Sequence, residues 1–330
     1  MKKSILSFPD HIIDALQIKN NISSPQENYS SVIISGQGGS AIGGFLILDL
    51  LDSKKSEIPL IVNQGYDLPY WANNKTLLII SSYSGNTEET INVYKQGIKN
   101  NCYIICLTSG GKLLEMAIKN NIEYCLLPSG FQPRAAIGYS IVQLFNILND
   151  KKICISHNSQ NLDSFKNVAF FLKDNQSNIK KEAKKISDLI DNNISIMYCS
   201  SLFSSSALRF KQQINENSKS HCWFNIIPEM NHNEIVGWSK EYNSILTFFI
   251  NSSFDTKKNI NRISLTQKHI KHYSKTHFIS PKGEDVFSQI FYLIHLFDFV
   301  SLFLANKKNV DPSKILPIDK LKLGLNNNND

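Results

Sequence analysis

Hydroxyl side chains are concentrated in the segment SSYSGNTEET, residues 81–90, directly after the apolar run TLLII. Ser82, Ser84 and Thr87 flank a Gly-Asn pair at the expected start of a helix. Hydroxyls combined with the free backbone N–H groups of a helix N-terminus form a compact site for one phosphate monoester. A helix cap needs one hydroxyl rather than three, although a cap and a phosphate site can coexist. The pattern therefore favours an anion site where a buried strand ends.

The glycine-rich segment GQGGS, residues 36–40, is a second candidate turn. It is close to a dinucleotide-binding fingerprint, which requires an acidic residue at the end of a second strand about 20 residues further on. The corresponding segment SEIPLIVNQGY ends in Asn63 and Gln64 instead. A nicotinamide-dependent enzyme is therefore the weakest of the functions considered.

Strand–turn–helix units must position these turns, and they recur along the chain. Strands that alternate with helices of about 10–15 residues predict parallel sheets covered by helices on both faces. The pattern lapses into polar, turn-rich residues around 150–165 and then restarts. The units occupy residues 31–51, 77–100 and 102–121, with a fourth strand at 124–130, and after the restart residues 194–219, 222–227 and 243–250.

We therefore expect two similar α/β lobes, residues 1–150 and 151–306, joined near 150–190. Residues 307–330 are expected to add a C-terminal helix and tail. The apolar run IFYLIHLFDFVSLFLA includes His295 and Asp298, which favours a buried helix over a membrane span.

Composition excludes several classes of protein. The 330 residues are 42% hydrophobic and 19% charged, as in globular proteins. The net charge is +7, but the lysines are dispersed and form no basic stripe with interleaved aromatics, which disfavours nucleic acid as a partner. A mildly positive field still favours an anionic small substrate.

The cysteines and the N-terminus indicate a cytoplasmic protein. No C-x-x-C pair occurs, and several cysteines lie in apolar, strand-like runs, so we expect reduced core thiols. The start MKKSILSFPDHII has too short an apolar region for a signal peptide. The cysteines are Cys102, Cys106, Cys125, Cys154, Cys199 and Cys222.

Several motifs together resemble a known family. SYSGNTEET after a strand resembles the phosphate-binding signature of the sugar isomerase (SIS) domain, and GQGGSAIGG resembles its first turn. GFQPRAAIGYS, LRFKQQINENSKSH and PEMNHNEIVGW are similar to segments of the bifunctional phosphoglucose/phosphomannose isomerase family, in the same order and over almost the whole chain. Gln37 stands where family members commonly have Met, at a turn position.

The resemblance implies two SIS-type, flavodoxin-like αβα sandwich subdomains with central parallel sheets. It also implies an aldose–ketose isomerase that interconverts glucose 6-phosphate and mannose 6-phosphate with fructose 6-phosphate through a cis-enediol. That chemistry requires no metal and no redox cofactor. The resemblance assigns the phosphate group of the substrate to Gly38, Gly39, Ser40, Ser82, Ser84 and Thr87.

Four further residues receive catalytic roles from the resemblance. Glu216 is the expected base, although any Glu three residues before a Lys, here Lys219, can also form a surface pair. Arg134 would steady the enediolate or hold a water molecule beside it, unless it forms a surface ion pair. His232 would open the sugar ring from the neighbouring subunit of a homodimer; the nearby acids Glu229 and Glu234 do not match the family's base.

The fourth residue is a lysine near the C-terminus, where both Lys320 and Lys322 are available. On a helix Lys322 shares one face with Ile315, Ile318 and Leu325, whereas Lys320 falls on the other side, so we favour Lys322. The alternative function is a non-catalytic SIS module that senses sugar phosphates. Such a module would not need Glu216, His232 and Arg134 together. An amidotransferase of amino-sugar synthesis would need a further domain.

Overall fold

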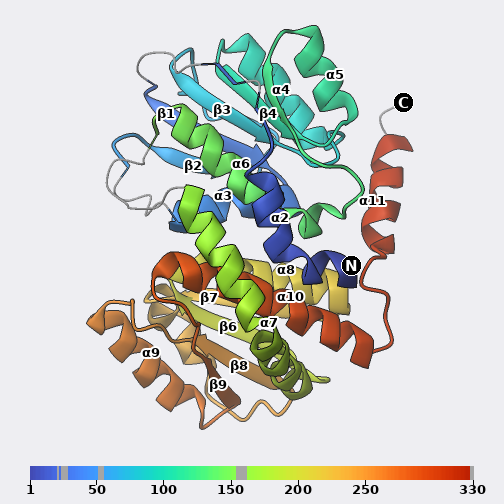
Figure 1. The fold of residues 1–330 in the computed structure, drawn as a ribbon. Coiled ribbons are helices and arrows are strands. Elements are labelled where there is room, and N and C mark those ends of the chain that lie inside the picture. The colour runs from blue at the N-terminus through green and yellow to red at the C-terminus, as the bar shows by residue number, and fades with distance from the viewer. Residues whose placement is uncertain (21, 24–28, 51–55, 154–161, 328–330) are drawn as a thin grey trace.

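The computed structural model of the protein describes residues 1–20, 22–23, 29–50, 56–153 and 162–327. Its described elements form two α/β lobes, one stacked on the other (Figure 1). Each lobe has a parallel sheet with helices on both faces, as the repeated strand–turn–helix pattern predicted.

The first lobe contains a five-stranded parallel sheet in the order β2-β1-β3-β4-β5. Its strands are β1 (Ser31–Gly36), β2 (Leu60–Asn63), β3 (Thr76–Ser81), β4 (Tyr103–Thr108) and β5 (Glu123–Leu126). Every residue of β1 and β3 is buried, which explains their continuous apolar sequences. The order reverses between β1 and β3, and flavodoxin-like sheets bind their ligands at the carboxyl ends of the strands on either side of such a reversal.

Helices cover both faces of this first sheet. Successive side chains of β3 point to opposite faces: Leu78 and Ile80 pack in one cluster with α4 and α5, and Ile79 packs in another with α3 and α6. Figure 1 shows α3 and α6 on the side that faces the second lobe. The helices of this lobe are α1 (Lys2–Leu6), α2 (Phe8–Ala15), α3 (Gly38–Leu50), α4 (Glu88–Lys99), α5 (Gly111–Lys119) and α6 (Ile137–Asp150), with the short 3-10 helix η2 (Pro133–Ala135).

The second lobe repeats the plan with four parallel strands in the order β7-β6-β8-β9. The strands are β6 (Ile194–Ser200), β7 (Cys222–Ile227), β8 (Ile245–Ile250) and β9 (Lys275–Ile279). The helices are α7 (Leu162–Ile190), α8 (Ser204–Ser218), α9 (Lys257–Ile270), α10 (Val286–Lys307) and α11 (Leu316–Asn327), with 3-10 helices η3 (Ser201–Phe203), η4 (Glu229–His232) and η5 (Glu234–Gly237). The pattern did not predict β9, an edge strand in which only Ile279 is buried.

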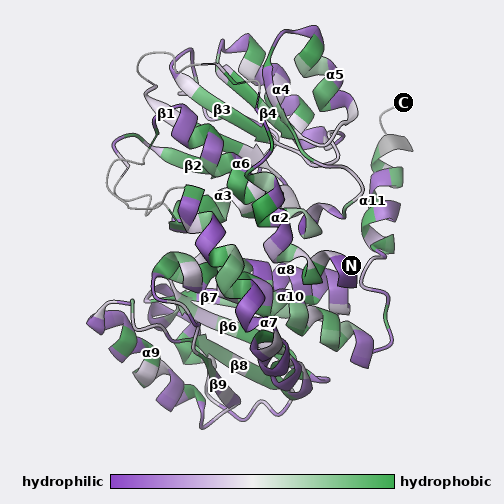
Figure 2. Ribbon diagram, in the orientation of Figure 1, coloured by the Kyte–Doolittle hydropathy of each residue, from purple (hydrophilic) through white to green (hydrophobic). Residues whose placement is uncertain are grey.

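The two lobes share one apolar core. A single cluster of buried side chains runs from Ile34 and Ile79 in the first sheet to Phe248 and Phe291 in the second lobe. Helix α10 packs against α7 and α8 at the centre of this cluster, and it is green along most of its length in Figure 2. Among the described residues it is the one helix long and apolar enough to span a membrane, yet 83% of its apolar window is buried inside the fold. The prediction of a buried helix is therefore confirmed.

Five of the six cysteines lie in the described residues, and all five are free and buried, as predicted. Burial raises the pKa of the Cys106 and Cys125 thiols to about 12. These thiols therefore stay protonated, and they serve as packing groups rather than nucleophiles. Cys154 lies outside the described residues.

Asp49 at the end of α3 links the lobes. Its carboxylate accepts hydrogen bonds from the Ser205 backbone N–H at 2.9 Å and from the hydroxyl groups of Ser204 and Ser205 at the start of α8. Burial raises its pKa from 3.8 to about 6, although these hydrogen bonds act in the opposite direction. The charged form is therefore disfavoured in the folded protein.

We expect this carboxyl group to make stability depend on pH between about pH 4 and pH 6. The folded state holds the proton more tightly than the unfolded chain, so the free energy of unfolding falls as pH rises through this window, by up to roughly 3 kcal/mol. Urea denaturation of the wild type and of Asp49→Asn across pH 4–7 measures the effect, because the other carboxyl groups cancel in the difference. If the free energy of unfolding depends on pH in the same way in both proteins, this prediction is wrong.

Candidate active site

The hydroxyl row forms the turn between β3 and α4. Thr87 occupies the N-cap position of α4 with an extended backbone, yet its side chain forms no capping hydrogen bond. Its Oγ1 instead accepts a hydrogen bond from the Oγ of buried Ser82 at 3.1 Å. Ser84 is exposed, and its Oγ accepts the N–H of Asn86 at 3.3 Å. Capping therefore does not explain the hydroxyl row, which lies beside the free N–H groups of a helix N-terminus.

Gly85 at the centre of this turn lies against the loop that follows β4. Its φ is +68°, and an added Cβ would lie 1.8 Å from the carbonyl oxygen of Gly110. The carbonyl of Gly85 accepts the N–H of Leu113 at 2.9 Å. Only glycine fits this position, and the close approach fixes the turn against the neighbouring loop.

The glycine-rich turn after β1 meets the hydroxyl turn through Ser40. The Ser40 Oγ accepts the backbone N–H of Tyr83 at 3.0 Å, which leaves its own proton available for a ligand. Gly38 and Gly39 begin helix α3, where the first N–H groups have no intrahelical acceptor. An added Cβ on Gly39 would lie 2.8 Å from the backbone N of Arg134. The two turns and the Arg134 loop therefore form one continuous wall.

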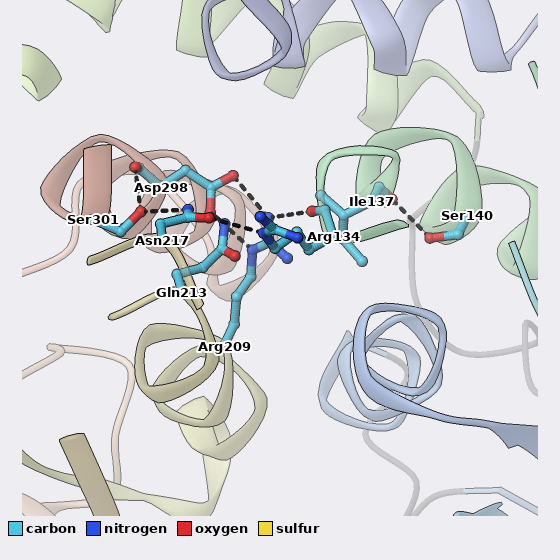
Figure 3. A network of polar contacts seen from close by, with 8 residues as sticks. All are labelled: Arg134, Ile137, Ser140, Arg209, Gln213, Asn217, Asp298 and Ser301. Carbon is cyan, nitrogen blue, oxygen red and sulfur yellow. Dashed lines mark hydrogen bonds and ion pairs between the residues drawn. The ribbon is translucent and has the colours of Figure 1, made fainter. Parts of the chain in front are cut away.

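Arg134 is buried, with 3% of its surface exposed. Its Nη1 lies 3.2 Å from Oε2 of Glu216, its Nε donates to Oδ1 of Asn217 at 2.8 Å, and its Nη2 donates to the carbonyl of Pro312 at 2.6 Å. Burial lowers the pKa of Arg134, and the Glu216 carboxylate opposes that shift. The guanidinium is thus a fixed, desolvated cation rather than part of a surface ion pair. Figure 3 shows Arg134 beside Asn217 and Arg209.

Glu216 lies near the C-terminal end of α8, with 25% of its side chain exposed. The ion pair that its carboxylate forms is with Arg134, not with Lys219. The Lys219 Nζ instead contacts the main-chain carbonyl of Glu216, and Lys219 has a left-handed backbone with φ 53°. A partly exposed carboxylate beside a fixed cation can take up and return a proton.

His232 and Lys322 lie apart from this cluster. His232 is exposed in η4, and within the described part of the chain it forms no hydrogen bond, ion pair or ring contact. Lys320 and Lys322 are both exposed on α11, although the segment before that helix reaches Arg134 through Pro312. A single chain thus brings the two turns, Arg134 and Glu216 together. The roles of His232 and Lys322 remain predictions.

The acids near His232 have structural partners. The Glu234 carboxylate accepts hydrogen bonds from the hydroxyl of Tyr198 and from Nδ2 of Asn225. The carboxylate of Glu229 accepts the side-chain amide of Asn233 at 3.0 Å. Glu234 therefore anchors the loop that carries His232.

The corresponding turn of the second lobe is also rich in hydroxyls, but carboxylates bind three of them, those of Ser200, Ser204 and Ser205. Ser200 at the end of β6 donates to Asp255 at 2.6 Å, and Ser205 donates to Asp49. A phosphate there would meet negative charge. In the first lobe, by contrast, the turn hydroxyls have no carboxylate partner in the described part of the chain, which favours that lobe for an anion.

Sequence reasoning missed the residues that hold Arg134. Asn217 binds its side chain, Arg209 binds its main-chain carbonyl at 3.0 Å, and Asp298 binds Arg209. One signal was visible, because an Asp within a long apolar helix needs a buried partner. That partner lies on α8, where Arg209, Gln213 and Asn217 are four residues apart and share one face of the helix. The sequence does not show that this face meets Asp298, because the contact depends on the fold.

Fold and site together define a tandem sugar isomerase (SIS) protein. The family model of the bacterial phospho-glucose isomerase C-terminal SIS domain matches residues 179–325. The bifunctional phosphoglucose/phosphomannose isomerase of Caldicellulosiruptor bescii is 38% identical over 98% of each chain, and that of Aquifex aeolicus is 33% identical over 89% of this chain and 90% of its own. The chain therefore belongs to the bifunctional phosphoglucose/phosphomannose isomerase family and is an isomerase.

A solved structure shares the fold at low sequence identity. The C-terminal domain of glucosamine-fructose-6-phosphate aminotransferase from Francisella tularensis aligns with a TM-score of 0.74, over 95% of this chain and 98% of its own. The identity is 13%, so the comparison concerns the fold alone.

Proposed function

We propose that the protein interconverts glucose 6-phosphate and mannose 6-phosphate with fructose 6-phosphate. The names of the two relatives above support these substrates. The observation that carries the proposal is the Glu216 carboxylate 3.2 Å from the fixed guanidinium of Arg134, beside two turns suited to a phosphate. An acid–base group, a cation and an anion anchor are what aldose–ketose isomerisation needs.

The phosphate group would bind to the N–H groups of Gly38 and Gly39 and to the four hydroxyls of the two turns. Glu216 would then remove the proton from C2 of the open-chain aldose. The C1 oxygen gains a proton as the enediol forms. The C2 hydroxyl then loses its proton as the enediol becomes a ketose, and Glu216 returns its proton to C1. Arg134 would stabilise the negative charge that develops on the oxygens between these steps. Oxidation at C2 balances reduction at C1, so no external electron acceptor is consumed. The phosphate-binding hydroxyls are those of Ser40, Ser82, Ser84 and Thr87.

His232 and Lys322 would complete the site in a homodimer. Both side chains are exposed in the single chain, which supports a contribution of His232 across the interface of two copies. An imidazole can donate and accept protons at neutral pH, as opening of the sugar ring requires. Lys322 would lie near the sugar oxygens at C1 or C5. Reduced, buried thiols support a cytoplasmic location.

The test follows the reaction of purified, EDTA-treated protein by NMR in D₂O, with glucose 6-phosphate and mannose 6-phosphate in separate samples. We expect fructose 6-phosphate from both, with deuterium at C1 because the enediol proton exchanges with solvent. If fructose 6-phosphate forms from glucose 6-phosphate but not from mannose 6-phosphate, mannose 6-phosphate is not a substrate. No product, together with calorimetric binding of the sugar phosphates, would favour the non-catalytic sensor.

A further inference from the structure

A buried ion pair joins α8 to α10. Arg209 and Asp298 are 1% and 3% exposed. Nε and Nη2 of Arg209 donate to the two carboxylate oxygens of Asp298 at 3.1 and 2.8 Å, a bidentate arrangement. The side-chain amide of Gln213 adds a third hydrogen bond to Asp298 at 2.7 Å. Both oxygens of the Asp298 carboxylate are therefore hydrogen-bonded although it lies in a mostly apolar helix.

The pair reaches Arg134 through its main chain. The same Nη2 of Arg209 that binds Asp298 also donates to the carbonyl oxygen of Arg134 at 3.0 Å. Arg134 belongs to the short η2 segment, whereas Arg209 and Asp298 belong to two long packed helices. The ion pair thus connects a loop of the first lobe to rigid elements of the second.

A second path reaches the side chain of Arg134. Asn217 accepts from the Arg134 Nε through Oδ1, while its Nδ2 donates to the Ser301 Oγ at 2.9 Å. Ser301 in turn donates to the main-chain carbonyl of Asp298 at 2.8 Å. Because Ser301 holds the donor end of the amide, the acceptor end must face Arg134. Figure 3 shows these side chains converging on Arg134 from α8 and α10.

Stability alone does not explain this network. Burying two charges incurs a large desolvation penalty, and well-packed apolar residues often replace such a pair without loss of stability. A network of this kind does define one geometry. Glu216 is the residue before Asn217 on α8, so the same helical turn carries the carboxylate and the group that orients its cation.

We propose that Asp298 and Asn217 are positioning residues that hold the guanidinium of Arg134 beside the carboxylate of Glu216. Asp298 acts through Arg209, whereas Asn217 binds Arg134 directly and is itself oriented by Ser301. Neither residue needs to touch the substrate. The proposal rests on the isomerase function proposed above, because Glu216 and Arg134 have their roles there. It predicts that loss of the network impairs the chemical step and leaves binding through the phosphate turns intact.

The test compares Asp298→Asn with Glu123→Gln. The control removes the charge from a second ion pair, in which the buried Lys151 Nζ lies 3.1 Å from the half-buried Glu123 at the start of β5, at the opposite end of the sheet from the carboxyl ends of the strands. We expect kcat for glucose 6-phosphate to fall about 10²-fold in Asp298→Asn, because a shift of the Arg134 guanidinium by about 1 Å would have an effect of that size. KM should remain unchanged. Glu123→Gln should lower the melting temperature and leave kcat unchanged.

A double-mutant cycle with Arg134→Lys identifies the path. If Asp298 acts through Arg134, Asp298→Asn should lower kcat little further once Arg134 is replaced. Independent, multiplicative losses would overturn the proposal, as would equal kcat values for Asp298→Asn and Glu123→Gln. If Asp298→Asn does not fold, Ser301→Ala replaces it in the same double-mutant cycle with Arg134→Lys. We expect Ser301→Ala to lower kcat by a smaller factor. A wild type inactive on every sugar phosphate would instead refute the proposed function.

Discussion

Replacement of Glu216 by Gln should lower kcat by about 10³-fold, within the range of general acid–base catalysis, while sugar phosphates still bind. The amide keeps the size of the side chain and can accept a hydrogen bond from Arg134, 3.2 Å away in the wild type. It cannot take up the proton from C2. Initial rates with glucose 6-phosphate, and calorimetric titration with the same ligand, separate the loss of chemistry from a loss of binding.

A matched control is Glu229→Gln, because Glu229 accepts a hydrogen bond from Asn233 in the loop after β7. It should retain wild-type kcat. Mixing Glu216→Gln with His232→Ala should restore part of the activity if each site takes the carboxylate from one subunit and the imidazole from the other. Wild-type turnover by Glu216→Gln would show that another residue is the base.

Replacement of Gly85 by Ala should weaken substrate binding about 10²-fold, the effect of displacing a binding group by about 1 Å. The new methyl would lie 1.8 Å from the carbonyl oxygen of Gly110, and the backbone φ of +68° disfavours any residue with a Cβ. The turn must therefore move, and Ser84 and Thr87 move with it. Calorimetry with inorganic phosphate and with glucose 6-phosphate measures the loss directly.

Gly237→Ala is the control for this change, because no atom lies within 4 Å of its added Cβ. It should bind both ligands as the wild type does. Circular dichroism at the assay temperature verifies that each variant is folded. Unchanged phosphate affinity in folded Gly85→Ala would place the anion site elsewhere.

The sequence allowed accurate prediction where the pattern is local. The apolar runs that became β1 and β3 are continuous because both faces of the strands are buried, and that pattern is visible without the fold. The turn Ser82–Thr87 was placed between a strand and a helix, and α4 begins at Glu88. The family motifs identified Glu216 and Arg134, which the structure brings within 3.2 Å of each other.

Long-range partners were not predictable in this way. Arg134 binds the carbonyl of Pro312, which is 178 positions away, and the carboxylate of Asp298 binds Arg209 across 89 positions. No periodicity encodes such pairs, because they depend on how α8, α10 and η2 cross in space. Strand β9 was missed for a different reason: a short, largely exposed edge strand that begins with three polar residues resembles a loop in a single sequence.

The placement of Asp298 has a consequence for the newly made chain. Helix α10 has the length and composition of a membrane-spanning segment, and Asp298 lies near its middle. A carboxylate at the centre of such a segment opposes its insertion by the translocon, by about 2.5–3.5 kcal/mol. Arg209 has already been synthesised when Asp298 leaves the ribosome, so its partner is present as soon as α10 can pack. One carboxylate thus orients the candidate active site and disfavours diversion of the nascent protein into the bilayer.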